Sequence, residues 1–288
     1  MKEQIQQHVK NLLAEGKIKG FLGLRQQGTD IGPYLFTTAD ELEDLSLGDR
    51  QDPGDSRYPL DKILKRIAYK YPTDSFGVLV RGCDERALQQ LFTVSMLHRD
   101  RVIPVGFACP PELAEQHQCW KPFPDALVAG EVSPGVVGGE DAVGAQLDLL
   151  GKLQEWFDTF DRCVKCYGCR NICPVCFCQE CSLEHKELIG TGALPPEVPV
   201  FHLVRAVHMA GRCIDCGLCE DACPVDIPLR LLYRKVNEIV VNVFDYETGS
   251  STDQSPFSML GDKVTLEPKP IQLAEMDNSV VSIPSDAN

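Results

Sequence analysis

The chain has 288 residues, which is enough for one or two domains with a hydrophobic core. Its formal net charge of −14 argues against a nucleic-acid partner, because phosphate binding needs clustered lysine and arginine side chains. There is no run of about 18 or more apolar residues and no apolar signal segment at the start, so we expect neither a membrane span nor export.

The chain also contains 14 cysteines. A disulfide framework would need an oxidising compartment, which the missing signal segment does not support. We therefore expect the thiols to be metal ligands in a reducing, anaerobic cytoplasm.

The first elements are predicted from hydrophobic spacing. Residues 3–14 carry apolar side chains at helical intervals before Gly16, and the apolar run 21–24 predicts a strand. Residues 30–61 contain nine acidic side chains together with several glycines and prolines, which predicts a solvated loop.

Helices and strands alternate in the next part of the chain. We expect a helix at 60–70, a strand at 76–80, a helix at 84–97 with Asp84 as its N-cap, and a strand at 102–107. This βαβ order predicts a parallel sheet.

Two cysteines come just after these strands, Cys83 after the first and Cys109 after the second. Ligands of open α/β sheets bind at the carboxyl ends of the strands. With Cys119 nearby, three thiolates could converge, and His117 is a candidate fourth ligand because imidazole replaces thiolate in some iron–sulfur centres. Three unrelated cysteines are the alternative.

Residues 130–144 are rich in glycine but lack the spacing of a phosphate-binding fingerprint, so we interpret them as a linker that ends a first domain at residues 1–144. In 145–160, Leu149, Leu153 and Phe160 share one helical face with Trp156. This helix is expected to pack a second domain, residues 145–246, onto its neighbour.

Eight cysteines form two copies of one spacing, and a proline follows each copy. The copies are Cys163, Cys166, Cys169 and Cys173, and Cys213, Cys216, Cys219 and Cys223. In two-cluster bacterial ferredoxins with this spacing, three thiolates of one run hold one cluster and the fourth holds the other. The spacing therefore predicts two [4Fe-4S] clusters, one on Cys163, Cys166, Cys169 and Cys223, the other on Cys213, Cys216, Cys219 and Cys173. Structural zinc is the alternative, but its ligands usually come as two separated pairs.

Cys176, Cys178 and Cys181 follow the first copy directly. They are either additional metal ligands or free thiols near the cluster, and the sequence leaves both readings open. His202 and His208 lie before the second copy and are either proton-coupled tuners of a cluster or packing residues.

The last predicted elements are a helix after Pro228 and an extended tail at 247–288, rich in serine, proline and aspartate. The predicted fold class is thus α+β and α/β: a small N-terminal α/β domain with a partly parallel sheet, then a 2[4Fe-4S] bacterial-ferredoxin-like domain with flanking helices, then the tail.

The ranges 163–181, 201–209 and 213–228 together resemble the carboxyl-terminal module of the beta subunit of deazaflavin-dependent formate dehydrogenases, including its extra cysteines. The ranges 77–87 and 103–109 resemble the flavin domain of the same hydrogenase and dehydrogenase beta-subunit family. The resemblance implies a domain that binds FAD and a third cubane, held by two isolated cysteines and a Cys-x-x-Cys pair.

Cys83 and Cys109 match the isolated positions, and Cys119 remains of the pair. The Gly-Gly stretch of the family's flavin site has no counterpart, which makes FAD binding doubtful. We therefore expect a trimmed flavin domain that kept its sheet, lost its hydride chemistry and binds no third cluster, although a third cluster stays an alternative.

The favoured function is an electron-transfer subunit that passes single electrons through two clusters. It would work with iron–sulfur or flavin subunits in a larger oxidoreductase, such as a formate dehydrogenase or a heterodisulfide-reductase-like assembly, and not as an enzyme alone. The alternatives are a flavin-containing catalytic subunit that exchanges a hydride with a deazaflavin or nicotinamide, and an iron–sulfur redox sensor. The acidic segment 30–61 and the tail are candidate docking surfaces.

Overall fold

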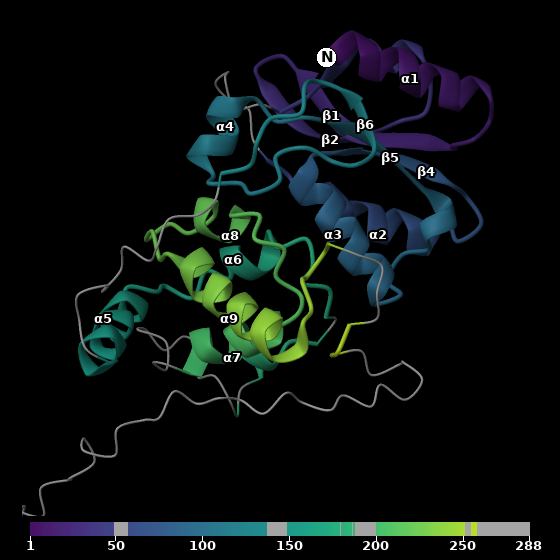
Figure 1. Ribbon diagram of the computed structural model, residues 1–288. Helices are drawn as coiled ribbons and strands as arrows, with labels where there is room; N and C mark the ends of the chain where they lie inside the picture. The colour runs from purple at the N-terminus through teal and green to yellow at the C-terminus, as the bar shows by residue number, and fades with distance from the viewer. Residues whose placement is uncertain are drawn as a thin grey trace, which may run out of the picture.

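The computed structural model describes residues 1–48, 57–136, 149–178, 180–185, 187, 200–250 and 255–257. These residues form a sheet with helices on both faces and a neighbouring group of helices and loops that carries most of the cysteines (Figure 1). The elements are α1 (Lys2–Ala14), β1 (Gly20–Gln27), β2 (Asp30–Phe36), η1 (Asp40–Asp44), β3 (Leu45–Ser46), α2 (Leu60–Lys70), β4 (Phe76–Val80), α3 (Gly82–Thr93), η2 (Arg99–Arg101), β5 (Val102–Phe107), α4 (Pro111–Gln116), β6 (Leu127–Ala129), α5 (Leu149–Asp161), α6 (Gly168–Asn171), η3 (Ser182–Glu184), α7 (Val200–Met209), α8 (Leu218–Asp221) and α9 (Leu229–Phe244).

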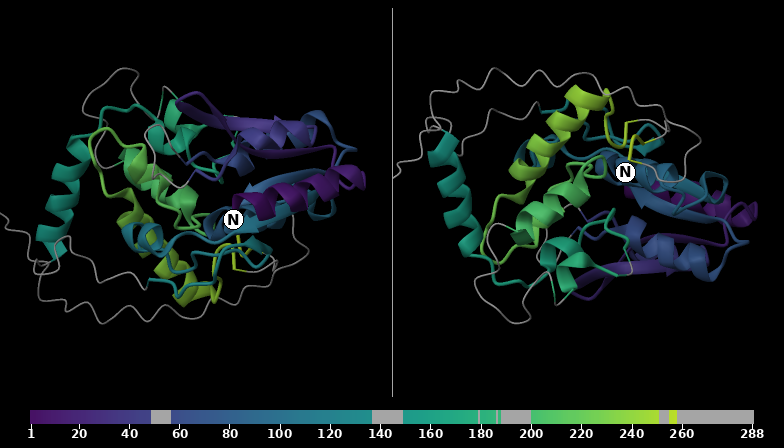
Figure 2. Two further views of the ribbon diagram at one scale, coloured as in Figure 1. Left: turned by 90° about the horizontal axis from the view of Figure 1, so that it is seen from above. Right: turned by 90° about the horizontal axis from the view of Figure 1, so that it is seen from below.

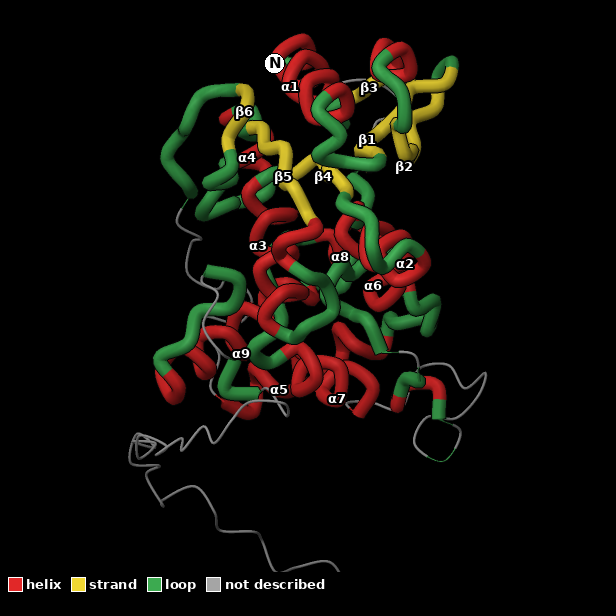
Figure 3. Tube along the Cα trace, turned by 90° about the vertical axis from the view of Figure 1, so that its right-hand side faces the viewer, coloured by secondary structure: helices red, strands yellow, loops and turns green. Residues whose placement is uncertain are grey.

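The sheet has the strand order β2-β1-β4-β5-β6, and β3 pairs with β1. Strands β1, β4, β5 and β6 are parallel neighbours, whereas β2 and β3 pair with β1 in the antiparallel sense. Helix α1 covers one face, and α2 and α3 cover the other (Figure 3). The partly parallel sheet is therefore confirmed.

The expected loop at 30–61 is wrong over its first half, because β2, η1 and β3 lie there. That prediction was based on the acidic residues, glycines and prolines of the segment. In the structure β2 pairs with β1, and its Phe36 lies opposite Phe21 and is fully buried. A cross-strand pair of this kind depends on a partner distant in sequence. Residues 49–56 lie outside the described part of the chain.

Helix α3 begins two residues earlier than expected and ends at Thr93, not 97. Its N-cap is Arg81, and Asp84 is the third helical residue, where its carboxylate accepts the Arg81 backbone N–H at 2.9 Å. Gly82 allows this start, since a Cβ there would lie 2.2 Å from the carbonyl oxygen of Lys121. The tight approach fixes Cys83 at the end of β4.

The cysteine-rich elements lie beside the sheet-containing part, with α5 farthest from the sheet (Figure 2). Their small core contains Phe160, Met209, Ile214 and Tyr233, and Ala87 of α3 joins it from the other part of the molecule. Of the predicted α5 face, Phe160 is buried but Leu153 is 46% exposed. The predicted helix after Pro228 is α9.

Two other predictions fall mostly outside the described part of the chain. Positions 137–148 of the predicted linker and helix start, and most of the tail beyond 250, lie outside the described residues. Within the described residues, no helix has the length and apolar character needed to cross a membrane.

Candidate metal centres

Four cysteines from both copies of the repeat line one cavity, which we call site 1. They are Cys163, Cys166, Cys169 and Cys223. Apolar side chains, among them Val225 and Leu229, complete the wall. Cys223 therefore comes from the second copy and lies with three cysteines of the first.

A second cavity, site 2, has the reciprocal composition. It is lined by Cys213, Cys216, Cys219 and Cys173, with Val175, Met209 and Ile214 as apolar neighbours. Cys213 and Cys173 are buried. The wall also includes three charged residues to which the sequence assigned no role, Arg205, Arg230 and Asp215, and Asp215 forms an ion pair with Arg230 at 2.5 Å.

The cysteine loops turn sharply at matching positions in the two copies. Lys165 and Tyr167 have φ of 47° and 58°, and Asp215 and Gly217 have φ of 55° and 80°. Such left-handed turns aim successive backbone N–H groups inward, which suits an anionic group. In site 1 the Lys165 N–H lies 3.4 Å from the Cys163 sulfur, and the Ile227 N–H lies 3.4 Å from the Cys223 sulfur.

Burial makes these thiols hard to ionise without a metal. It raises the pKa of Cys169 to about 11 and that of Cys213 to about 12, and raises the pKa of Cys216 well above its usual value. A thiolate in such a place needs a cation beside it, and metal binding releases the proton.

The four-sulfur cavities suit a cluster better than a single ion. Among the residues that the structure describes, no three His, Cys, Asp or Glu side chains are grouped as ligands of one ion would be. A cube presents four iron corners, so its thiolates surround a larger volume than the tetrahedral shell of zinc. The residues of sites 1 and 2 therefore fit [4Fe-4S] clusters.

Arg205 of α7 connects the two sites. It lines site 2, and its Nη2 donates to the carbonyl oxygen of Cys169 in site 1 at 2.7 Å. The side chain is 3% exposed and lies over the ring of Tyr233, and within the described residues no carboxylate pairs with it. Burying such a charge is costly unless opposite charge lies near. Two anionic clusters would supply that charge.

The two candidate histidines of α7 separate in the structure. His202 is 1% exposed, lines site 1 and stacks on Phe160 with ring centroids 4.5 Å apart. Burial lowers the pKa of His202 to about 4, so the ring is neutral at pH 7. His208 is exposed and does not line either site.

Cys83, Cys109, Cys119 and His117 line a third cavity, site 3. Burial raises the pKa of Cys83 to about 11 and that of Cys109 to about 12. The structure thus brings together the three cysteines and the histidine that the strand ends suggested. A fourth cysteine, Cys216, also lines this cavity, but it is one of the four cysteines of site 2.

Arginines that the sequence did not mark join site 3 to site 2. Arg57 is 8% exposed, and its Nη2 lies 3.4 Å from the Cys83 sulfur. Arg230 and Cys216 line both cavities, so the two sites share a wall. Arg57 lies in an acidic segment, and no local pattern distinguishes it from a surface residue.

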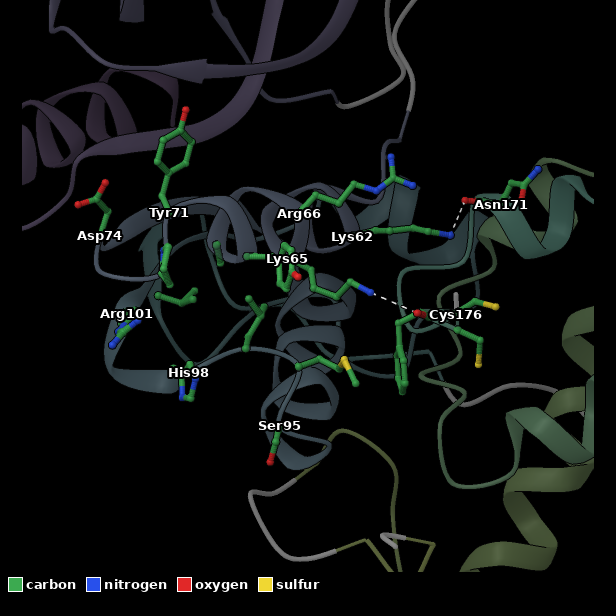
Figure 4. A pocket seen from close by; sticks show the side chains of 18 of the residues that line it. Lys62, Lys65, Arg66, Tyr71, Asp74, Ser95, His98, Arg101, Asn171 and Cys176 are labelled. Carbon is green, nitrogen blue, oxygen red and sulfur yellow. Dashed lines mark hydrogen bonds between the residues drawn. The ribbon is translucent and has the colours of Figure 1, made fainter. Parts of the chain in front are cut away.

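The extra cysteines lie elsewhere. Cys176, Cys178 and Cys181 line a cleft of about 1050 Å³ between α2 and the cysteine-rich part (Figure 4). Cys178 is exposed and the other two are half-buried. None of the three lines site 1, 2 or 3.

Comparison with known proteins found a matching family model and similar proteins. The family model "4Fe-4S binding domain" matches residues 206–228, which include the second cysteine copy. The chain is 41% identical over 104 residues to the F420-dependent formate dehydrogenase subunit beta of Methanocaldococcus jannaschii. It has the same identity over the same length to F420-dependent formate dehydrogenase 1 subunit beta of Methanococcus maripaludis.

Each match covers 36% of this chain and 27% of the relative, so the chain spans about a quarter of the curated relatives' length. The resemblance to the beta subunits is confirmed over a partial region of the chain. The chain therefore carries a 4Fe-4S binding domain at residues 206–228 and is similar, over 104 residues, to F420-dependent formate dehydrogenase beta subunits.

Proposed function

We propose that the chain is an electron-transfer subunit of a larger anaerobic oxidoreductase in the cytoplasm, related to formate dehydrogenase or to a heterodisulfide-reductase-like assembly. The observation that carries this proposal is the pair of four-cysteine cavities connected by Arg205. The curated relatives, which are formate dehydrogenase beta subunits, support it.

When bound, the [4Fe-4S] clusters supply one-electron transfer. The chain's own residues would hold them by the eight cysteines of sites 1 and 2. Apolar side chains such as Val225 and Ile214 exclude water, and turn N–H groups face the sulfurs. These are the features by which a protein sets a cluster potential.

A third cluster is a second candidate because of one observation, the convergence of three cysteines and His117 in site 3 beside Cys216. The sequence favoured no third cluster, since a fourth thiolate is missing. A cluster completed by His117 would extend the electron path from the sheet to site 2. The flavin-containing catalytic subunit and the redox sensor remain alternative proposals.

Iron and flavin analysis of the anaerobically purified chain tests these proposals. About eight irons per chain without flavin would fit two clusters. About twelve irons, falling to about eight in Cys83→Ser, would fit a third cluster in site 3. Stoichiometric flavin reduced by a deazaflavin would favour the catalytic alternative. A purified chain that contains no iron would refute every one of these proposals. Partners that co-purify from the native host would then identify the reaction.

A further inference from the structure

The cleft beside the extra cysteines is lined by two parts of the molecule. One wall comes from α2 and the segments before β4 and β5, and the other from residues 170–184 of the cysteine-rich part (Figure 4). We call it the basic cleft.

The basic cleft concentrates positive charge in a chain whose net charge is −14. Lys62 donates to the carbonyl oxygen of Asn171 at 2.9 Å, and Lys65 donates to that of Phe177 at 3.3 Å. These acceptors are neutral, so they leave the lysine charges uncompensated. Arg66 and Arg101 add two further positive charges.

The acidic side chains in the same lining do not cancel this charge. Glu184 pairs with Arg170 at 2.7 Å, so that pair is neutral as a unit. Asp74 is the remaining carboxylate of the lining. The surface therefore favours an anionic occupant.

The rim of the basic cleft has the composition of a protein interface. Tyr69 is 88% exposed, Tyr71 is 44% exposed and Met96 is 41% exposed. Exposed tyrosine and methionine beside arginine are enriched where proteins dock, whereas a small anion needs only the charges. The occupant suggested by the rim is a protein.

The basic cleft also lies close to the ligands of both cluster sites. Arg170 and Asn171 of its wall directly follow Cys169 of site 1. Cys176 of the same wall donates its backbone N–H to the carbonyl oxygen of Cys173, a site 2 cysteine, at 3.3 Å. The wall of the basic cleft is therefore directly connected to buried cysteines of both sites.

We propose that the basic cleft docks a small protein electron carrier with an acidic surface, which exchanges electrons with the clusters across the wall at Cys176. This inference rests on the proposed electron-transfer function. The step is a one-electron exchange: the carrier is oxidised by one electron and a cluster is reduced by one, or the reverse. No bond forms or breaks and no proton moves.

The test uses the full cluster-loaded chain and a reduced, acidic [4Fe-4S] ferredoxin as the carrier probe. Stopped-flow absorbance follows cluster reduction at several salt concentrations. The charge-reversal variant is Arg66→Glu with Arg101→Glu. Its matched control is Lys10→Glu with Lys19→Glu, which changes net charge equally on the part of the molecule that carries α1 and β1.

We expect the wild-type rate to fall as salt rises, and the charge-reversal variant to be slower by about tenfold or more at low salt, as electrostatic steering predicts. The control should stay within about twofold of the wild type, since the steering field is local to the cleft. Tyr69→Ala, which removes an exposed rim side chain, should also slow the carrier. Reduction by the viologen radical, a small cation that needs no docking, should stay fast in every variant.

Equal carrier rates in the charge-reversal variant and its control would overturn the proposal. A second result would also overturn it: millimolar inorganic phosphate inhibits carrier-driven reduction of the wild type but not of the charge-reversal variant, and Tyr69→Ala has no effect. That result would indicate a site for a small anion. If the charge-reversal variant loses reduction by viologen, its clusters are damaged and its carrier rate says nothing about docking. The carrier rate of Tyr69→Ala is then the test, and a rate equal to that of the wild type would overturn the proposal. Failure of the viologen to reduce clusters in the wild type would refute the electron-transfer function itself.

Discussion

Removing the charge of Arg205 should lower the potentials of both clusters. A cation stabilises the reduced, more negative cluster, so its loss disfavours the added electron. At a separation of about 7 Å and an effective dielectric of about 20, one charge changes this energy by about 2 kcal/mol, or about 100 mV for one electron. We therefore expect Arg205→Met to lower both potentials by about that amount, because Arg205 lines site 2 and hydrogen-bonds to Cys169 of site 1.

The assay is an anaerobic redox titration followed by electron paramagnetic resonance, with Arg205→Lys and Arg212→Gln as controls. The lysine variant keeps the charge and should preserve most of the potential. Arg212 lies over the Phe177 ring at 5.1 Å and lines neither site, so its loss should have little effect. The reasoning fails if Arg205→Met lowers the potential of only one cluster. It also fails if Arg205→Lys lowers both potentials by as much as Arg205→Met does.

Three further predictions concern other parts of the chain. Cys223→Ser should damage the site 1 cluster and spare site 2, and site-resolved spectra that show the reverse would refute the crossed ligation. Gly82→Ala should destabilise the fold by about 2 kcal/mol, measured as a lower melting temperature, because the new Cβ would lie 2.2 Å from the carbonyl oxygen of Lys121. Gly32→Ala is the control, since a Cβ at Gly32 has no other atom within 4 Å. Hydrogen bonds from the Thr37 N–H and the Tyr34 hydroxyl lower the pKa of Glu41 to about 2. The ionised Glu41 therefore stabilises this turn above its ordinary pKa near 4.5, and the gain is lost as pH falls through about 2. Amide exchange at Thr37 should be faster in Glu41→Gln than in wild type at pH 6, and a difference that persists unchanged at pH 2 would contradict this.

Local patterns were enough for most of the sheet-containing part. Strand β4 at Phe76–Val80 and helix α2 at Leu60–Lys70 occur where apolar spacing and chain punctuation predict them. Strand β2 was missed because its stability comes from pairing with β1 across a turn, and its own apolar residues are interrupted by Gly32 and Pro33. Burial by a partner strand cannot be read from one segment's composition.

The candidate sites show the same difference between signals that are local in the sequence and contacts that are not. The grouping of the eight repeat cysteines could be predicted because their spacing is local, and the approach of Cys83 to Cys109 followed from the parallel strand order. Arg57 and Arg205 were not assigned roles, because their contacts reach 26 and 36 residues along the chain, to Cys83 and Cys169. A long-range polar contact of one arginine leaves no periodic trace in the sequence.

The wall that Cys216 and Arg230 share between sites 2 and 3 has a consequence for how this module can be reused. In a free-standing ferredoxin the whole insulation of each cluster belongs to one small unit. Here the sheet-bearing part forms part of the enclosure, since Arg86 of α3 donates to the carbonyl oxygen of Ile214 at 3.2 Å beside site 2. The cysteine-rich segment is therefore not self-contained: expressed alone, it would expose to water and oxygen the side of its core that Arg86 and Ala87 of α3 now cover.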